Sequence, residues 1–133
     1  MATIIPYLAV KDGKCREAFE FYKEALGGEL ELMRLGDSPG NESSPEADLV
    51  MHVALTGPIT LYGCDNVMGG SITHGDNVRI SYIGTVAEIT ATYEKLSAGG
   101  KTTHPLESTF FGTYGDLTDK YGFLWMFQAD KED

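Results

Sequence analysis

Two amphipathic segments, each followed by a pair of glycines, constrain the fold of this chain more than any other feature. In residues 14–26 and 86–96, apolar side chains recur at steps of three and four, which predicts two helices with one apolar face each. Gly27-Gly28 and Gly99-Gly100 end them, because glycine adopts the left-handed conformation of a helix C-cap without a Cβ penalty. The glycine pairs lie about half the chain apart, which indicates an internal duplication.

Short apolar stretches surround the helices in the same order in both halves. They predict strands at residues 4–10, 29–35, 49–55 and 59–64, and again at 78–84, 101–107, 114–119 and 123–128. Each half therefore has the order βαβββ. We expect a single α+β domain over residues 1–133, with its first half at about 1–66 and its second at about 77–129.

Two local signals refine this picture. Thr85 and Glu88 have the spacing of a capping box, in which a hydroxyl and a carboxylate accept hydrogen bonds from amide groups of the first helical turn. Residues 36–48 are rich in Gly, Ser, Pro and acidic residues, which predicts a long loop.

The charge balance excludes several classes of partner. The 133 residues include 20 acidic and 10 basic side chains, and the net charge of −10 repels nucleic-acid phosphates and anionic membrane surfaces. No stretch approaches the roughly 20 apolar residues of a membrane span, and the N-terminus lacks a signal-peptide pattern. We therefore expect a cytoplasmic protein, without nucleic-acid or membrane partners, and with Cys15 and Cys64 reduced.

Three stretches together resemble the vicinal oxygen chelate superfamily of glyoxalases, bleomycin-resistance proteins and extradiol dioxygenases, and within it the PhnB-like branch. They are PYL at 6–8 with AFEFYK at 18–23, GDSP at 36–39 with MHVAL at 51–55, and FG at 111–112 with TDKYGFLW at 118–125. The resemblance spans nearly the whole chain. It implies paired βαβββ modules whose curved mixed sheets surround a central cavity, and a homodimer in which elements are shared or exchanged.

Metal-using members of this superfamily carry four ligands, usually His, Gln or Glu, on the first and last strands of each half. By strand alternation, the corresponding positions here are Ile5 or Tyr7, Thr60 or Tyr62, Asn77, and Met126. Divalent metals need carboxylates, thiolates or imidazoles as ligands. Neither of the two possible strand registers places four such ligands at these positions. We therefore expect no metal, no cofactor and no metal-dependent lyase or dioxygenase chemistry at this site.

The same alternation predicts an aromatic and apolar cavity lining with few polar groups, which is typical of a small-molecule pocket. Arg79 is its most informative member, because a guanidinium on a central strand needs an anionic partner. That partner is either a protein carboxylate, Asp116 or Glu107, or an anionic ligand. The predicted lining consists of Tyr7, His52, Ala54, Tyr62, Arg79, Ser81, Leu124, Met126 and Gln128.

Two aromatic segments complete the candidate site. Phe110 and Phe111 precede Gly112 in a predicted loop, and exposed paired aromatics beside a glycine commonly cover a pocket. Trp125 lies among apolar residues of the last strand, which favours a place in the core or in a dimer interface.

Two functions remain open. The first is a metal-free homodimer that binds a small apolar, aromatic or anionic molecule without converting it, as drug-sequestering relatives do. The alternative is a lyase, isomerase or dioxygenase that uses His52 as general acid or base, or an atypical metal site. A methyltransferase is not indicated, because no glycine-rich nucleotide loop follows a strand. The predicted ligand contacts are Tyr7, Tyr62, Arg79, Ser81, Phe111, Met126 and Gln128.

Overall fold

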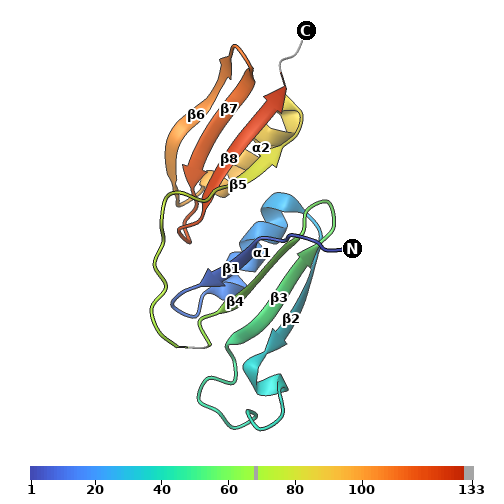
Figure 1. Ribbon diagram of the computed structural model, residues 1–133, viewed down its shortest axis with the longest axis vertical. Coiled ribbons are helices and arrows are strands. Elements are labelled where there is room, and N and C mark those ends of the chain that lie inside the picture. The colour runs from blue at the N-terminus through green and yellow to red at the C-terminus, as the bar shows by residue number, and fades with distance from the viewer. Residues whose placement is uncertain (68, 131–133) are drawn as a thin grey trace. The chain divides into compact units, whose positions relative to one another are not determined.

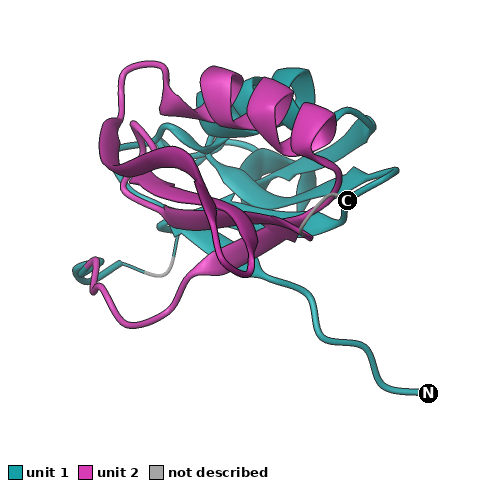
Figure 2. Ribbon diagram, turned by 90° about the horizontal axis from the view of Figure 1, so that it is seen from above, with its two compact units in different colours: residues 1–73 teal, residues 74–133 magenta. Residues whose placement is uncertain are grey.

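The computed structural model of the chain describes residues 1–67 and 69–130. Its contacts divide it into two compact units, residues 1–73 and residues 74–133 (Figure 2). Each unit holds one long helix and one four-stranded sheet (Figure 1). The predicted α+β class and the repeated βαβββ order are therefore confirmed, whereas the cavity enclosed by both sheets and the single domain stay predictions.

The first unit contains a sheet with the strand order β1-β4-β3-β2. Strands β1 and β4 are parallel, and the other neighbours are antiparallel. Its elements are β1 (Tyr7–Val10), α1 (Cys15–Leu26), β2 (Glu29–Arg34), the short 3₁₀ helix η1 (Leu35–Asp37), β3 (Val50–Thr56) and β4 (Leu61–Asp65).

The second unit repeats this topology with the strand order β5-β8-β7-β6. Strands β5 and β8 are parallel, and β8, β7 and β6 follow each other antiparallel. Its elements are β5 (Ile80–Ile83), α2 (Val86–Ser97), β6 (Lys101–Thr109), β7 (Gly112–Thr118) and β8 (Leu124–Asp130).

The core of the first unit lies between α1 and one face of its sheet. The predicted apolar face of α1 is buried, and so are the alternate strand residues Leu8, Val53, Leu55 and Leu61. Gly63 of β4 lies directly under the helix, where an added Cβ would stand 2.5 Å from Cε1 of Phe19 and 2.7 Å from the carbonyl oxygen of Leu8. The helix approaches the sheet this closely because position 63 has no side chain.

A buried carboxylate joins three elements of this unit. Asp65, at the end of β4, is 2% exposed. One of its oxygens accepts a hydrogen bond from the backbone N–H of Cys15 at 3.0 Å, and the other accepts from the N–H of Val50 at 2.7 Å. The first contact satisfies an amide at the start of α1, where Lys14 provides no side-chain cap.

The second core is built in the same way between α2 and its sheet, with Leu96, Trp125 and Phe127 fully enclosed. Trp125 is 1% exposed and donates from Nε1 to Asp119 at 2.8 Å, so its predicted place in the core is confirmed. The capping box at the start of α2 is also present: Glu88 N–H donates to Thr85 Oγ1, and Thr85 N–H donates to Glu88 Oε1.

Strand boundaries differ most from the prediction at two places. The first strand begins at Tyr7 rather than Ile4, because Pro6 has no N–H and offers only its carbonyl oxygen, which accepts from Tyr62. The loop predicted at residues 108–113 shrinks to Phe110 and Phe111, because Thr109 pairs with Gly112 and extends the β6–β7 hairpin.

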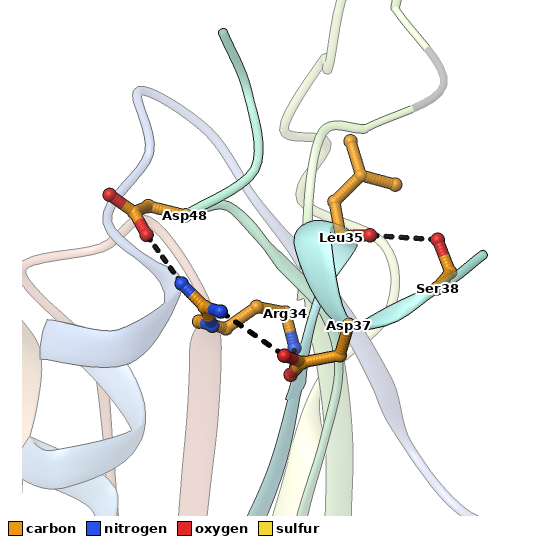
Figure 3. Close-up of polar contacts among 5 residues, drawn as sticks. All are labelled: Arg34, Leu35, Asp37, Ser38 and Asp48. Atoms are coloured by element: carbon orange, nitrogen blue, oxygen red, sulfur yellow. Dashed lines mark hydrogen bonds and ion pairs between the residues drawn. The ribbon is translucent and has the colours of Figure 1, made fainter. Parts of the chain in front are cut away.

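The predicted loop after β2 is held at its base by Arg34 (Figure 3). The guanidinium donates to Asp48 at 2.7 Å and to Asp37 at 3.2 Å, so one side chain joins the two ends of the loop. Backbone bonds from Leu35 to Leu49 and from Gly36 to Ala47 continue this closure. These contacts raise the pKa of Arg34, chiefly through the hydrogen bond to Asp37.

Within the described part of the chain, no helix is long and apolar enough to cross a membrane.

Candidate functional site

Each sheet has one face that its helix does not cover, and we call this the helix-free face. On the first sheet, side chains that alternate with the buried core point to it. Tyr7 and Met33 on this face are 51% and 46% exposed, which is unusual for side chains of this size on a sheet. Register and burial place on it Tyr7, Ala9, Glu31, Met33, His52, Ala54, Tyr62 and Cys64.

Three rings meet on the helix-free face of the first sheet, and we call Tyr7, His52 and Tyr62 the aromatic trio. Tyr7 and Tyr62 are cross-strand partners, with ring centroids 6.5 Å apart and rings nearly perpendicular at 88°. The His52 ring lies 5.1 Å from the Tyr62 ring and 5.7 Å from the Tyr7 ring. The three residues therefore lie on one face of the sheet, as strand alternation predicts.

The hydroxyl of Tyr7 is hydrogen-bonded to Nδ1 of His52 at 3.1 Å. Burial, followed by the neighbouring Cys64 thiol, raises the pKa of Tyr7 to about 12. Tyr7 therefore keeps its proton at neutral pH and stays able to donate. When it donates to Nδ1, the neutral imidazole carries its hydrogen on Nε2 and has no acceptor left.

The helix-free face of the second sheet carries several of the predicted contacts. Ser81 of β5 pairs with Met126 of β8, and Gln128 pairs with Tyr114 of β7. Asn77 precedes β5, so the residue beside Met126 is Ser81 instead. Ligand binding at Ser81, Met126 and Gln128 stays a prediction.

A polar cluster that the sequence reasoning missed lies on the same face. His104 of β6 and Asp116 of β7 are cross-strand partners, and Nδ1 of His104 lies 2.9 Å and 3.0 Å from the two carboxylate oxygens. The hydroxyl of Tyr114 donates to the same carboxylate at 2.7 Å. The sequence pattern assigns His104 no role, because its pairing with Asp116 depends on a bulged register that local patterns do not reveal.

The environment of Asp116 keeps it ionised. Burial opposes the charge, but hydrogen bonds from Tyr114 and His104, with the charges of His104 and Arg79, outweigh it and lower the pKa of Asp116. Burial and the hydrogen bond to Asp116 raise the pKa of Tyr114.

Arg79 forms no ion pair with either predicted carboxylate among the described residues. Its charge nevertheless contributes to the lowered pKa of Asp116, and it offsets a small part of the rise in the pKa of Tyr114. Arg79 is exposed and lies just before β5.

Phe110 and Phe111 form the tip of the β6–β7 hairpin, with exposed fractions of 88% and 42%. The rings stack edge to face with their centroids 5.2 Å apart. Phe111 also contacts the Tyr114 ring at 6.2 Å. The predicted role of Phe111 in covering a ligand stays a prediction.

The residues at the superfamily's metal positions do not fit a divalent ion. The cross-strand pair in the first sheet offers two phenols, and the pair of Ser81 with Met126 offers a hydroxyl and a thioether. Neither pair contains a carboxylate or an imidazole, the groups that carry such sites. Across residues 1–67 and 69–130, no cluster of three or more His, Cys, Asp or Glu side chains is arranged to hold a metal.

A model of the glyoxalase/bleomycin resistance protein/dioxygenase superfamily matches residues 4–127. The chain belongs to this superfamily. The resemblance seen in the sequence is therefore confirmed, and the βαβββ units described above are this superfamily's architecture.

Individual relatives agree with this assignment. Protein PA1353 from Pseudomonas aeruginosa is 34% identical, and its crystal structure matches with a TM-score of 0.86 over 99% of this chain and 100% of that one. A Bacillus cereus structure described as a putative 3-demethylubiquinone-9 3-methyltransferase, PhnB protein, is 25% identical, with a TM-score of 0.77 over 96% and 99%. Protein YjdN of Escherichia coli strain K12 is 27% identical over 143 residues, covering 96% of this chain and 95% of that protein. The structural relatives of this superfamily member thus include a PhnB protein.

Proposed function

We propose that this protein binds a small aromatic or apolar molecule on the helix-free face of the first sheet and does not convert it. The aromatic trio is the observation that carries the proposal. Strands β1, β3 and β4 bring three rings within 6.5 Å of each other on a face that no helix of this unit covers. Flat aromatic ligands stack on such rings at about 0.5–1.5 kcal/mol per ring pair beyond area burial.

The chemistry of the metal positions supports binding over catalysis. A divalent ion at these positions would meet only two phenols, a hydroxyl and a thioether. These groups carry no negative charge, so they do not offset the free energy needed to remove the ion's water shell. The proposal keeps the sequence prediction that Arg79, Ser81, Met126, Gln128 and Phe111 of the second unit contact a ligand, with Arg79 pairing with an anionic group.

Isothermal titration calorimetry with 2-naphthoate, a flat aromatic carboxylate, tests the proposal. We expect 2-naphthoate to bind more tightly than cyclohexanecarboxylate, which has the charge but no aromatic ring. Replacing either tyrosine of the trio by serine (Tyr7→Ser or Tyr62→Ser) removes one stacking surface. The expected loss of affinity is roughly two- to twelvefold, which corresponds to about 0.5–1.5 kcal/mol.

Ile4→Ser is the matched control, because Ile4 is an apolar residue that is 98% exposed and lies outside the sheet. It should leave the affinity for 2-naphthoate unchanged. The proposal fails if the wild-type chain does not bind 2-naphthoate, or if both tyrosine variants bind it as well as the wild type does.

The hydrogen bond between Tyr7 and His52 supports an alternative, in which His52 acts as general acid or base of an isomerase, lyase or dioxygenase. A base role needs the tautomer with the hydrogen on Nδ1, with Tyr7 as acceptor, so that Nε2 keeps its lone pair. The test is ring cleavage of catechol and isomerisation of the glutathione–methylglyoxal adduct, by the wild type and by His52→Ala. Turnover that disappears in His52→Ala would establish the enzyme.

We also propose a homodimer and a cytoplasmic location, as the superfamily resemblance and the composition suggest. The homodimer gains support from the sheet orders, in which β1, β2, β5 and β6 are edge strands, because an edge strand can pair with a strand of another chain. Light scattering on a sizing column measures the mass directly, and a monomer would contradict the proposal.

A further inference from the structure

The β6–β7 hairpin carries a second group of interacting side chains, which shares no residue with the aromatic trio. We call His104, Asp116 and Tyr114 the His104 cluster, and Phe110 with Phe111 the hairpin tip. The Asp116 side chain is 8% exposed, whereas the His104 side chain is 67% exposed. The cluster therefore consists of a buried carboxylate that holds an imidazole reaching out to solvent.

The hydrogen bonds of the cluster determine the tautomer of His104. Although burial opposes the charge, the hydrogen bonds from Tyr114 and His104 lower the pKa of Asp116, so both carboxylate oxygens are acceptors at neutral pH. Nδ1 of His104, at 2.9 and 3.0 Å from these oxygens, is then the donor. In the neutral imidazole the lone pair lies on Nε2, which makes no hydrogen bond to any residue from 1–67 or 69–130.

The backbone under the imidazole is held in place. The ladder between β6 and β7 shifts register on both sides of His104, between Thr102 and His104 and again between His104 and Glu107. Bulges of this kind re-aim a side chain, and here the re-aimed side chain is the imidazole. From α2, the buried Tyr93 donates its hydroxyl hydrogen toward the carbonyl oxygens of both His104 and Asp116, at 3.0 and 3.3 Å.

Tyr114 joins the His104 cluster to the hairpin tip. Its hydroxyl donates at 2.7 Å to Oδ2 of Asp116, the oxygen that also lies 3.0 Å from Nδ1 of His104. The Tyr114 ring lies 6.2 Å from the ring of Phe111, which in turn contacts Phe110 edge to face at 5.2 Å. The imidazole and the aromatic rings are therefore linked by direct contacts within one hairpin.

The hairpin tip is held by Thr109. The Thr109 hydroxyl donates to the carbonyl oxygen of Gly112 at 2.5 Å and accepts from the N–H of Phe111 at 3.3 Å. Thr109 and Gly112 are also the last pair of the β6–β7 ladder. Phe110 and Phe111 are nevertheless exposed, so a fixed turn presents aromatic surface to solvent.

We propose that the β6–β7 hairpin binds a phenol, whose ring packs against Phe111 and Tyr114 and whose hydroxyl donates to Nε2 of His104. Asp116 positions the imidazole and does not touch the ligand. A neutral ligand fits better than an anion, because Asp116 is itself an anion. The inference rests on this hairpin alone and stands whether or not the aromatic trio binds a ligand.

NMR titrations of the full chain with 6-hydroxyquinoline and 6-methoxyquinoline test the site. The two probes share their rings, and only the first has an O–H to donate. The backbone amide signals of His104 and Phe111 report binding at the hairpin separately from binding at the first sheet. We expect both signals to saturate, with a dissociation constant about fivefold lower for 6-hydroxyquinoline, the equivalent of about 1 kcal/mol for one net hydrogen bond.

Two variants separate the acceptor from the aromatic surface. His104→Phe keeps a ring but has no acceptor, so it should remove the preference for 6-hydroxyquinoline. Phe111→Ser should weaken binding of both probes roughly two- to twelvefold, because one stacking surface is lost. Val78→Ser is the matched control and should leave both affinities unchanged, because Val78 is exposed and precedes β5, which forms the other edge of the sheet.

Asp116→Asn tests the positioning of the imidazole. It should reduce the preference for 6-hydroxyquinoline and change the imidazole nitrogen shifts of His104, because the Nδ1–H tautomer is no longer enforced. The amide spectrum of the same sample shows that the fold is retained. Unchanged nitrogen shifts would contradict the positioning role of Asp116.

The inference is overturned if 6-methoxyquinoline binds the hairpin as tightly as 6-hydroxyquinoline, if neither probe saturates the His104 and Phe111 signals, or if the preference survives in His104→Phe. Wild-type affinity in Phe111→Ser would also overturn it. Failure of the aromatic trio has a different signature: 2-naphthoate affinity then does not respond to Tyr7→Ser or Tyr62→Ser, while the hairpin keeps its preference.

Discussion

The hydroxyl of Tyr7 lies 3.1 Å from Nδ1 of His52, although the two residues are 45 positions apart in the chain. They belong to β1 and β3, which do not neighbour each other in the sheet, since β4 lies between them. The side chain of Tyr7 therefore reaches over β4 beside Tyr62. This contact joins the rings of the aromatic trio into one surface. It also means that the tautomer of His52 depends on whether the Tyr7 hydroxyl donates or accepts the hydrogen bond.

Tyr7→Phe separates the ring of Tyr7 from its hydroxyl. The ring persists, so we expect 2-naphthoate to bind within about twofold of the wild-type affinity, whereas Tyr7→Ser loses the stacking surface. The free energy of unfolding should fall by at most about 1 kcal/mol, because one partly exposed hydrogen bond is lost. Calorimetry and urea unfolding measure the two quantities. An affinity loss in Tyr7→Phe as large as that in Tyr7→Ser would contradict stacking as the cause.

Gly63→Ala tests the close approach of α1 to its sheet. The added methyl group would collide with Phe19 and with the Leu8 carbonyl oxygen, so the helix must move or the ring must leave its rotamer. We expect a loss of about 1–3 kcal/mol in the free energy of unfolding, measured by urea titration.

Gly75→Ala is the matched control for this change. Gly75 has no positive φ, and an added Cβ there meets only the Asn77 side chain at 3.5 Å, an ordinary contact. The control should unfold at the wild-type midpoint. Equal stability of Gly63→Ala and the control would show that α1 does not lie against β4 as described.

Asp116→Asn tests the charge of the buried carboxylate through the pH dependence of stability. The folded state lowers the pKa of Asp116, so its contribution to stability is present above the ordinary carboxyl range and is lost as the pH falls through the lowered value. We expect Asp116→Asn to unfold more easily than the wild type at neutral pH, and the difference to shrink below about pH 4. A difference that does not change between about pH 7 and about pH 2 would mean that the carboxylate is not held as its ion.

Arg34→Met tests the closure of the loop after β2. Its ion pairs are exposed, so the urea midpoint of the whole chain should barely move. The loop should open more often, and a glutamate-specific protease should cleave faster after Glu42 or Glu46. Lys23→Met, which removes the 4.0 Å pair with Glu29, is the control and should leave this cleavage unchanged. Cleavage at the wild-type rate in Arg34→Met would show that Arg34 does not close the loop.

Local patterns predicted the features of this fold that depend on neighbours in sequence. The buried face of α1, including Cys15, Phe19 and Tyr22, follows from steps of three and four, and strand alternation alone placed Tyr7 and His52 on one face.

Features that depend on pairing between residues far apart in the chain could not be predicted from the sequence. Asp65 accepts from Cys15 across 50 positions, and nothing near Asp65 in the sequence indicates a helix start. His104 meets Asp116 only because two register shifts bring them opposite each other. Long-range contacts of this kind are created by the sheet order, which composition and periodicity do not specify.

The central claim is that the aromatic trio is a binding surface, and NMR chemical-shift mapping during a titration with 2-naphthoate tests it most directly. The account predicts that the largest shifts fall on the ring protons of Tyr7, His52 and Tyr62, and that they saturate with a single affinity. Shifts that leave these three rings unchanged, or that never saturate, would contradict it.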